Sequence, residues 1–460
     1  MKLLTIFFLL IVVGCATYYQ SSYKFNKEFE SGNLDNALSA LRHSPGEERG
    51  KKQFLFDVNN GLVLSLLGKY EESNEYFEKA FIYGEDYRIN YLNEAASYLT
   101  NPNLTAYRGE DHEHLLLLYY KAINFLKLGK TEEALVECRR MNIRLQQLSD
   151  RYQSENKYKR DAFVHTLMGI IYDSDKDYNN AFIAYRNALE IYQDDYGRLF
   201  RVNVPSQLKK DLLRTAFLAG MNDELEKFKA DFQMMDYQYE NTEGGELVFF
   251  WHNGLSPIKA EWGMNFVLNR QGNHVVIANQ ELALQYAFDL SSYNEKDKKN
   301  LNSLEFFRVA FPRYIERPMQ FNAATISRDG NTNELELLED VNQIAFKCLQ
   351  ERMHVEFSKA LIRVALKKAS EYQLRKEDQT LGSLLGVVHA LTEQADTRNW
   401  QTLPHNIYYA RMPLQQGVNV VKFQVSDSHG QANQLEFTYS AKKGETLFHS
   451  FSSLESGYPN

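Results

Sequence analysis

The sequence has few of the residues that interrupt or crosslink regular structure. It contains 9 prolines, 24 glycines and 3 cysteines among 460 residues, against 29 tyrosines and 29 phenylalanines. So few cysteines exclude a disulfide scaffold, and so few helix breakers favour stacked helices that bury aromatic rings between them. The length exceeds what one compact core normally holds, which predicts two or three domains.

An excess of positive charge is also missing. The formal net charge is −8, and no basic stripe with interleaved aromatic residues occurs, which argues against nucleic acid as a partner. The hydrophobic fraction of 44% and the charged fraction of 24% are ordinary for folded proteins and exclude general disorder.

The common sequence-local catalytic motifs are absent. There is no G-x-S-x-G, P-loop, H-E-x-x-H or C-x-x-C. The densest set of potential metal ligands is residues 111–114, but His112 and His114 are two residues apart and would diverge on a helix. Glu110 and Asp111 instead favour a helix start, where acidic side chains complement the dipole. We therefore predict no enzymatic activity, no metal and no cofactor.

The longest apolar run lies at the N-terminus. Residues 3–13 follow Lys2 and are interrupted only by Thr5. A positive start and an apolar stretch of this length are typical of a secretory signal, because a membrane span needs about 20 residues.

The apolar run ends at Gly14 and Cys15, and this ending resembles the bacterial lipobox, in which the cysteine is acylated. We predict that residues 1–14 are a signal peptide and that Cys15 carries a membrane anchor of more than one acyl chain. The alternative is an ordinary signal peptide cleaved nearby, although small residues suited to that cleavage are scarce. Ala16 favours an outer-membrane lipoprotein facing the periplasm, with the cell surface as the alternative.

Internal repeats follow. The clearest unit combines Gly169, Tyr172, Ala181, Tyr185 and Ala188, and it resembles the tetratricopeptide consensus of about 34 residues. The small residues let two helices approach closely, and the tyrosines fill the space beside them.

The same frame recurs around the loops at residues 68–70 and 129–131. Two degenerate copies surround residues 32–37 and 219–228. Three clear repeats and two degenerate ones predict a mainly α fold with a tetratricopeptide-like α-solenoid over residues 15–235. An unrelated helical bundle with chance matches is the alternative.

A solenoid of this kind has a concave groove that commonly binds a peptide or a helix. We predict a scaffold or adaptor that binds one or more envelope proteins there. Candidate groove residues are Tyr119, Arg139, Arg140 and His165. Glu137 either lines the groove with the arginines or pairs within the repeat stack.

Residues 236–460 predict an α+β region with a β-sandwich-like domain. Strand patterns occur at residues 246–251, 264–268, 274–278, 306–311, 320–326, 407–412, 417–425 and 433–440. A helical insertion covers about 337–395, with helices at 337–371 and 381–394. Either one sandwich is assembled from both sides of this insertion, or two small domains are present. Gly244 and Gly245 predict a flexible joint, so residues 20–235 before it are expected to fold alone.

Cysteines and tryptophans allow further alternatives. Cys138 and Cys348 are predicted to be buried free thiols rather than a disulfide. Trp251, Trp262 and Trp400 would be exposed stacking platforms if the protein bound peptidoglycan or another carbohydrate, which is the second functional hypothesis. A scaffold protein would bury them, and Trp400 in particular is expected in the core.

Residues 107–113, 119–122, 134–140 and 392–404 resemble a family of uncharacterised bacterial lipoproteins with tetratricopeptide-like repeats and a C-terminal β region. The segment that ends after Trp400 is the most specific part. The resemblance implies an envelope location and supplies no catalytic residue. Cys138 stands where that family would have alanine.

Overall fold

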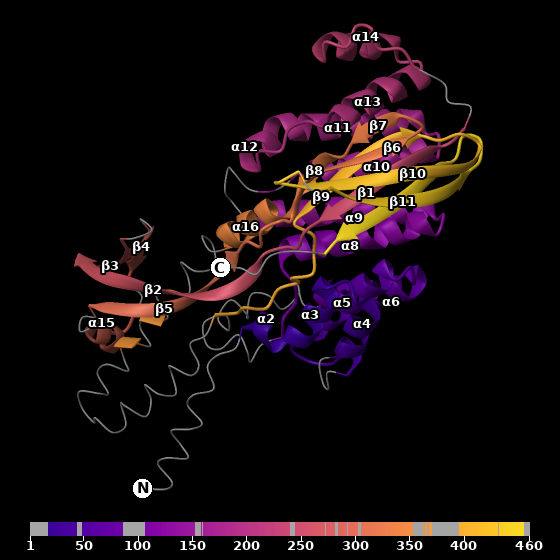
Figure 1. The fold of residues 1–460 in the computed structure, drawn as a ribbon. Helices are drawn as coiled ribbons and strands as arrows, with labels where there is room; N and C mark the ends of the chain where they lie inside the picture. The colour runs from indigo at the N-terminus through magenta and orange to yellow at the C-terminus, as the bar shows by residue number, and fades with distance from the viewer. Residues whose placement is uncertain are drawn as a thin grey trace.

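The computed structural model describes residues 17–43, 48–85, 106–151, 158, 160–239, 244–271, 273–280, 284–291, 293–301, 305–352, 361, 364–365, 368–369, 395–430 and 432–454. Cys15, the signal segment and the predicted helix at 381–394 lie outside these residues. Within them, a tetratricopeptide-like helical solenoid is followed by an α+β region, as predicted (Figure 1).

Antiparallel helix pairs build the first half. The helices are α2 (Tyr18–Ser21), α3 (Tyr23–Glu30), α4 (Leu34–Arg42), α5 (Gln53–Leu66), α6 (Tyr70–Glu85), α8 (Asp111–Lys127), α9 (Thr131–Arg151), α10 (Ala162–Ser174), α11 (Tyr178–Ile191), the π-helix η3 (Tyr192–Tyr196), α12 (Gly197–Leu199), α13 (Ser206–Leu218) and α14 (Asn222–Asp231).

Close approach within each pair explains the repeat pattern. A Cβ atom added to Gly61 on α5 would lie 2.7 Å from the ring of Phe77 on α6. A Cβ at Gly169 on α10 would likewise overlap the ring of Tyr185 on α11. Ala181 and Ala188 are completely buried in the same pair. The small-to-aromatic pattern of the predicted repeats therefore marks real helix contacts.

The described strands of the β part form three four-stranded sheets, in the orders β12-β1-β9-β8, β11-β10-β6-β7 and β4-β3-β2-β5. The strands are β1 (Glu246–Asn253), β2 (Ile258–Gln271), β3 (His274–Asn279), β4 (Leu284–Asp289), β5 (Phe306–Ile315), β6 (Phe321–Arg328), β7 (Asn331–Glu334), β8 (Glu336–Asp340), β9 (Asn406–Pro413), β10 (Gly417–Asp427), β11 (Ala432–Ala441) and β12 (Thr446–Ser453). Helices α15 (Glu295–Leu301) and α16 (Val341–Arg352) complete this half.

The first two sheets form a sandwich. Phe249 and Trp251 of the first sheet pack against Phe423 of the second, in a core that also contains Ile326 and Met412. Its strands come from residues 246–253, 321–340 and 406–453, on both sides of the predicted helical insertion. The third sheet has a hydrophobic core of its own, beside the sandwich that the sequence predicted.

Two local predictions were wrong. The predicted helix from residue 337 begins instead at Val341, because residues 336–340 pair with β9 as strand β8. Gly244 and Gly245 are buried and bound to the sandwich rather than forming a joint. Their carbonyls accept hydrogen bonds from the backbone N–H groups of Gly444 and Leu414, at 2.7 and 2.8 Å.

The sandwich and the solenoid share a hydrophobic core. Strand β1 is buried on both faces, so Phe249 and Trp251 point into the sandwich while Val248 and Phe250 join the core of the repeats. A strand covered on both sides reads as a continuous apolar run. A fragment that ends near residue 235 would therefore expose the apolar side of its helices.

Candidate functional site

The predicted groove is occupied by the chain itself. Helices α5, α8 and α10 are buried over most of their surfaces, and their core includes Phe250, Leu403 and Tyr409 of the second half. Trp400 is completely buried, with ring centroids 6.0 Å from Phe77 and 6.2 Å from Tyr120. The surface that many repeat proteins offer to a partner is here an internal interface.

Tyr119 illustrates this correction to the predicted groove residues. It is completely buried, and its hydroxyl lies 2.7 Å from Nε2 of His252. Nδ1 of that imidazole lies 3.1 Å from the hydroxyl of Ser452. Burial and the nearby Lys127 charge lower the pKa of His252 to about 3, which keeps the ring neutral. Tyr119 therefore ties α8 to the sheet and cannot meet a partner.

This Ser–His pair has no room for a substrate. The adjoining cavity has a volume of about 10 Å³ and is lined by His252, Ser452, Tyr120 and Thr402, among others. That volume accommodates roughly one water molecule. The pair is therefore a structural contact.

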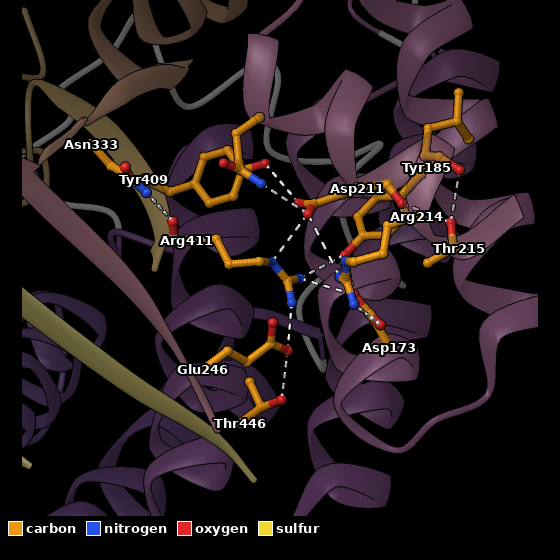
Figure 2. A network of polar contacts seen from close by, with 12 residues as sticks. Asp173, Tyr185, Asp211, Arg214, Thr215, Glu246, Asn333, Tyr409, Arg411 and Thr446 are labelled. Atoms are coloured by element: carbon orange, nitrogen blue, oxygen red, sulfur yellow. Dashed lines mark hydrogen bonds and ion pairs between the residues drawn. The ribbon is translucent and has the colours of Figure 1, made fainter. Parts of the chain in front are cut away.

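A buried ionic network joins the repeats to the sandwich at Arg411 of β9 (Figure 2). Its guanidinium lies 3.0 Å from Asp173 of α10, 3.1 Å from Asp211 of α13 and 2.6 Å from Glu246 of β1. Arg214 pairs with Asp173 as well. The hydroxyls of Tyr185, Tyr409 and Thr446 donate to Asp173, Asp211 and Glu246, respectively.

Opposite charges decide the ionisation of Glu246. Burial disfavours its charged form, but the charges of Arg411 and Arg214 lower the pKa of this carboxyl to about 2. Because buried charges are costly without partners, the network favours the arrangement of four elements, β1, β9, α10 and α13, in which all five charges meet.

A second buried network surrounds residues 110–114, where the sequence predicted a helix start. The structure confirms that start: Glu110 and Glu113 form a capping box at the beginning of α8. Glu110 also pairs with Lys259 of β2 and with Arg352 of α16, at 2.7 Å to the latter. Burial opposes its ionisation, but these two cations lower the pKa of Glu110 to about 2.

The neighbouring titratable groups hold structural positions. Glu113 accepts hydrogen bonds from the backbone N–H of Trp400 at 2.6 Å and from the hydroxyl of Tyr107 at 2.8 Å. Burial and the charge of Glu110 raise the pKa of Glu113 to about 7. Burial lowers the pKa of His112 to about 4. In the part of the chain that the structure describes, no three such side chains are placed to hold a metal ion.

A third buried cluster lies at the π-helix η3. The hydroxyl of Tyr196 is 2.9 Å from a carboxyl oxygen of Asp161 and 2.9 Å from one of Glu339 on β8. Tyr158 donates to the other oxygen of Asp161 at 2.5 Å. Burial and the charge of Asp161 raise the pKa of Glu339 well above its usual value. Tyr192 of η3 donates to the carbonyl of Leu338 at 2.8 Å, so the π-helix binds strand β8 directly.

The arginines have different positions. Arg140 lies 3.3 Å from both Glu78 and Glu137, and its guanidinium stacks over Phe81 at 4.9 Å. Glu137 is buried and also pairs with Lys121 at 2.9 Å, so it belongs to the repeat stack. Arg140 is thus a tie between α6 and α9 rather than a groove residue.

Arg139 is exposed on the outer helix α9, where no charged partner lies within reach among the described residues. His165 is half-buried on α10, and burial lowers the pKa of its imidazole. Of the four predicted groove residues, only Arg139 is freely accessible, and it lies outside the filled concave side.

The tryptophans and cysteines follow the expectations for a scaffold. Trp251 is completely buried, and its indole N–H donates to Ser453 at 2.8 Å. Trp400 is buried as predicted, while Trp262 is half-buried beside Arg313. No tryptophan therefore forms an exposed platform. Cys138 and Cys348 are both buried free thiols, as predicted.

Aliphatic side chains remain exposed on the outer helices of successive repeats. They are Ile82 on α6, Val136 and Ile143 on α9, and Ile183 on α11, with exposed fractions between 41 and 54%. Arg139 lies between the two residues of α9. Among the described residues, no helix is both long enough and apolar enough to cross a membrane.

Residues 164–195 match the family model of the tetratricopeptide repeat. No curated protein matches the chain significantly. Similar solved structures cover about half of this chain. BtubC (BKLC) from P. vanneervenii is 18% identical, covers 47% of this chain and 80% of its own, and has a TM-score of 0.31.

Two further structures are similar over the same share of the chain. MamA from Desulfovibrio magneticus RS-1 is 16% identical over 46% of this chain and 89% of its own, with a TM-score of 0.28. A putative kinesin light chain with nearly identical repeats, from Podospora anserina, is 11% identical over 49% and 97%, with a TM-score of 0.32. TM-scores this low carry no argument about function, so the repeat assignment depends on the family model and on the helix contacts described above.

Sequence reasoning missed the buried charges. Arg411, Glu246, Asp161 and Glu339 were not singled out, although they connect the two halves. One signal was available: Arg411 interrupts the apolar strand at residues 407–412. An arginine in a strand that is otherwise buried needs acidic partners from another element.

Proposed function

We propose that this chain is a lipid-anchored, non-catalytic adaptor of a bacterial cell envelope that binds another envelope protein. The anchor on Cys15 and the outer-membrane location rest on the lipobox-like N-terminus. Protein binding rests on the repeat architecture. The repeat stack and the sandwich are joined by buried ionic networks and by a shared core.

The location of the proposed binding surface follows from the concave side of the solenoid, which is filled. Since the chain's own strands occupy it, the partner binds the outer helices. There, Val136 and Ile143 lie seven residues apart on α9, about two helical turns, with Arg139 between them. The exposed aliphatic side chains could contact the apolar face of an amphipathic helix of the partner. Arg139 would then pair with an acidic residue at the edge of that face.

The anchor and the surface are tested separately. Fatty-acid labelling of cells should mark the wild-type protein but not Cys15→Ser. A photo-crosslinking residue at Ile143 should give a discrete product in intact cells, whereas the same residue at Glu295, exposed on α15, should not. Arg139→Glu should remove the Ile143 product without changing the thermal melt.

Two results would contradict this proposal. Labelling that persists in Cys15→Ser would remove the anchor. Products of equal yield from Ile143 and Glu295 would mean that the outer helices are not a specific surface. The carbohydrate alternative needs exposed aromatic platforms, whereas Trp251 and Trp400 are buried.

A further inference from the structure

Strand β11 is an open sheet edge. It is the outermost strand of the order β11-β10-β6-β7 and spans ten residues, Ala432–Ala441. Most of it is exposed, and it contains no proline, no lysine and a single charge, at Glu436. The unpaired backbone groups of such an edge are a template for another strand, which natural proteins usually block.

The other edges in the described part of the chain are protected. Strand β5 contains Pro312, which removes a backbone donor. Strands β4, β7 and β8 are short, with six, four and five residues, so each offers few unpaired backbone groups. Strand β12 is half-buried along nearly its whole length. Strand β11 therefore differs from every other described edge in being both long and exposed.

Apolar side chains also reach the margin of the sandwich at β11. Leu435, Phe437 and Tyr439 alternate along the strand on the face that points into the sandwich core, opposite Phe423, Val421 and Asn419 of β10. Leu435 is 44% exposed, and the two aromatic residues are half-buried. The core thus lacks a covering strand at this side.

We propose that β11 pairs in antiparallel fashion with β11 of a second copy, joining two four-stranded sheets into one of eight strands. A two-fold axis makes such an interface self-complementary. With Phe437 on the axis, Leu435 lies opposite the partner's Tyr439, and Phe437 lies opposite the partner's Phe437. Each copy then covers the apolar margin of the other.

Charge and the number of paired residues select this register. Side chains directly opposite each other in an antiparallel pair point to the same face of the sheet. The apolar residues of both copies therefore share one face only if the two strands are shifted against each other by an even number of residues. With Phe437 on the axis, Glu436 faces the partner's Thr438. With Glu436 on the axis, two carboxylates would lie directly opposite each other, which is destabilising. With Thr438 on the axis, Leu435 would face the partner's Ala441 and fewer residues would pair.

Cysteine crosslinking of the full chain in its membrane tests the register. Glu436→Cys combined with Thr438→Cys places each new thiol opposite one of the partner copy, at the separation of a cross-strand pair. Oxidation or a short bis-maleimide should convert most of this variant into a dimer on a denaturing gel. The matched control is Val418→Cys with Val420→Cys, two exposed positions on the outer face of β10, which should stay monomeric.

Sedimentation of the mature chain in detergent supplies a second readout. The wild type should sediment as a dimer, Leu435→Lys should shift to monomer, and Val418→Lys should remain a dimer. A wild-type monomer at micromolar concentration would overturn the proposal, as would equal crosslinking of the control pair. A crosslink from residues 436 and 438 to a different protein would also overturn it, while leaving the adaptor function intact.

Discussion

The phenol oxygen of Tyr196 lies 2.9 Å from Oε2 of Glu339. The same hydroxyl lies 2.9 Å from Asp161, yet it has only one proton to donate. Burial raises the pKa of Asp161, but Asp161 also accepts hydrogen bonds from Tyr158 and from the backbone N–H of Val164, which favour its charged form. Burial raises the pKa of Glu339 well above its usual value, so we expect Glu339 to be the protonated member of the pair and to donate to Tyr196.

This arrangement predicts the effect of Glu339→Gln. Because burial raises the folded-state pKa of Glu339 above its unfolded value, its contribution to stability is complete at low pH and is lost as pH rises. Glutamine also donates to Tyr196 but does not ionise in the unfolded chain. The variant should be more stable than the wild type at pH 7, and the difference should vanish near pH 4.

Urea unfolding followed by circular dichroism across that pH range measures the difference. Glu226→Gln, at an exposed site on α14, is the control and should parallel the wild type. A Glu339→Gln variant that is less stable at pH 7 would show that the carboxyl is ionised in the fold.

Glu246 has the opposite pH dependence. Its folded-state pKa of about 2 is below the unfolded value of about 4.5, so its contribution is present above pH 4.5 and is lost as the pH falls toward 2. Glu246→Gln should therefore be less stable than the wild type at neutral pH and should lose less stability between pH 4.5 and 2. Parallel acid titrations of the two proteins would contradict this assignment.

Arg411 is the cation that three buried carboxylates share. Arg411→Met leaves Asp173, Asp211 and Glu246 without their shared partner, and removing one member of a buried ion pair costs about 3–5 kcal/mol. Chemical denaturation should show a loss of that size. Lys422→Met removes an exposed ion pair with Glu436 that spans 3.8 Å and should change stability by about 0–1 kcal/mol.

Two glycines test the repeat packing. Gly169→Ala places a methyl group into the ring of Tyr185, and overpacking of this kind costs about 1–3 kcal/mol. Gly197 is also helical, with φ −59° and its nearest neighbouring atom 3.6 Å from an added Cβ. Gly197→Ala should therefore raise stability, by up to about 1 kcal/mol. Equal effects on the thermal melt would mean that α10 and α11 are not closely packed.

Replacing the adjacent residues Arg139 and Arg140 should affect stability to different extents. Arg140→Ala removes the partner of Glu78 and the cover of Phe81, and we expect a loss of about 1 kcal/mol in unfolding free energy. Arg139→Ala should change stability by less than about 0.5 kcal/mol, as at other exposed sites. A large loss of stability in Arg139→Ala would assign that residue to the repeat stack.

Periodicity determined much of this protein. The helix pairs followed from small residues facing aromatic ones, as at Gly169 and Tyr185, because that contact is local in sequence and recurs at Gly61 and Phe77. Strand β10 followed from the alternation that buries Val421 and Phe423. The buried positions of Cys138 and Trp400 were also predicted, since apolar and aromatic side chains have few alternatives to a core.

Only the tertiary structure decided what occupies the concave side. From the sequence, Tyr119 and Arg140 were predicted to contact a partner protein. The residues next to Tyr119 in the sequence do not indicate its contact with His252, which is more than a hundred positions away. Likewise, the partners of Arg411 come from α10, α13 and β1, and no local pattern encodes their convergence. Periodicity fixes which face of an element is apolar, whereas the surface that covers this face depends on how distant segments pack.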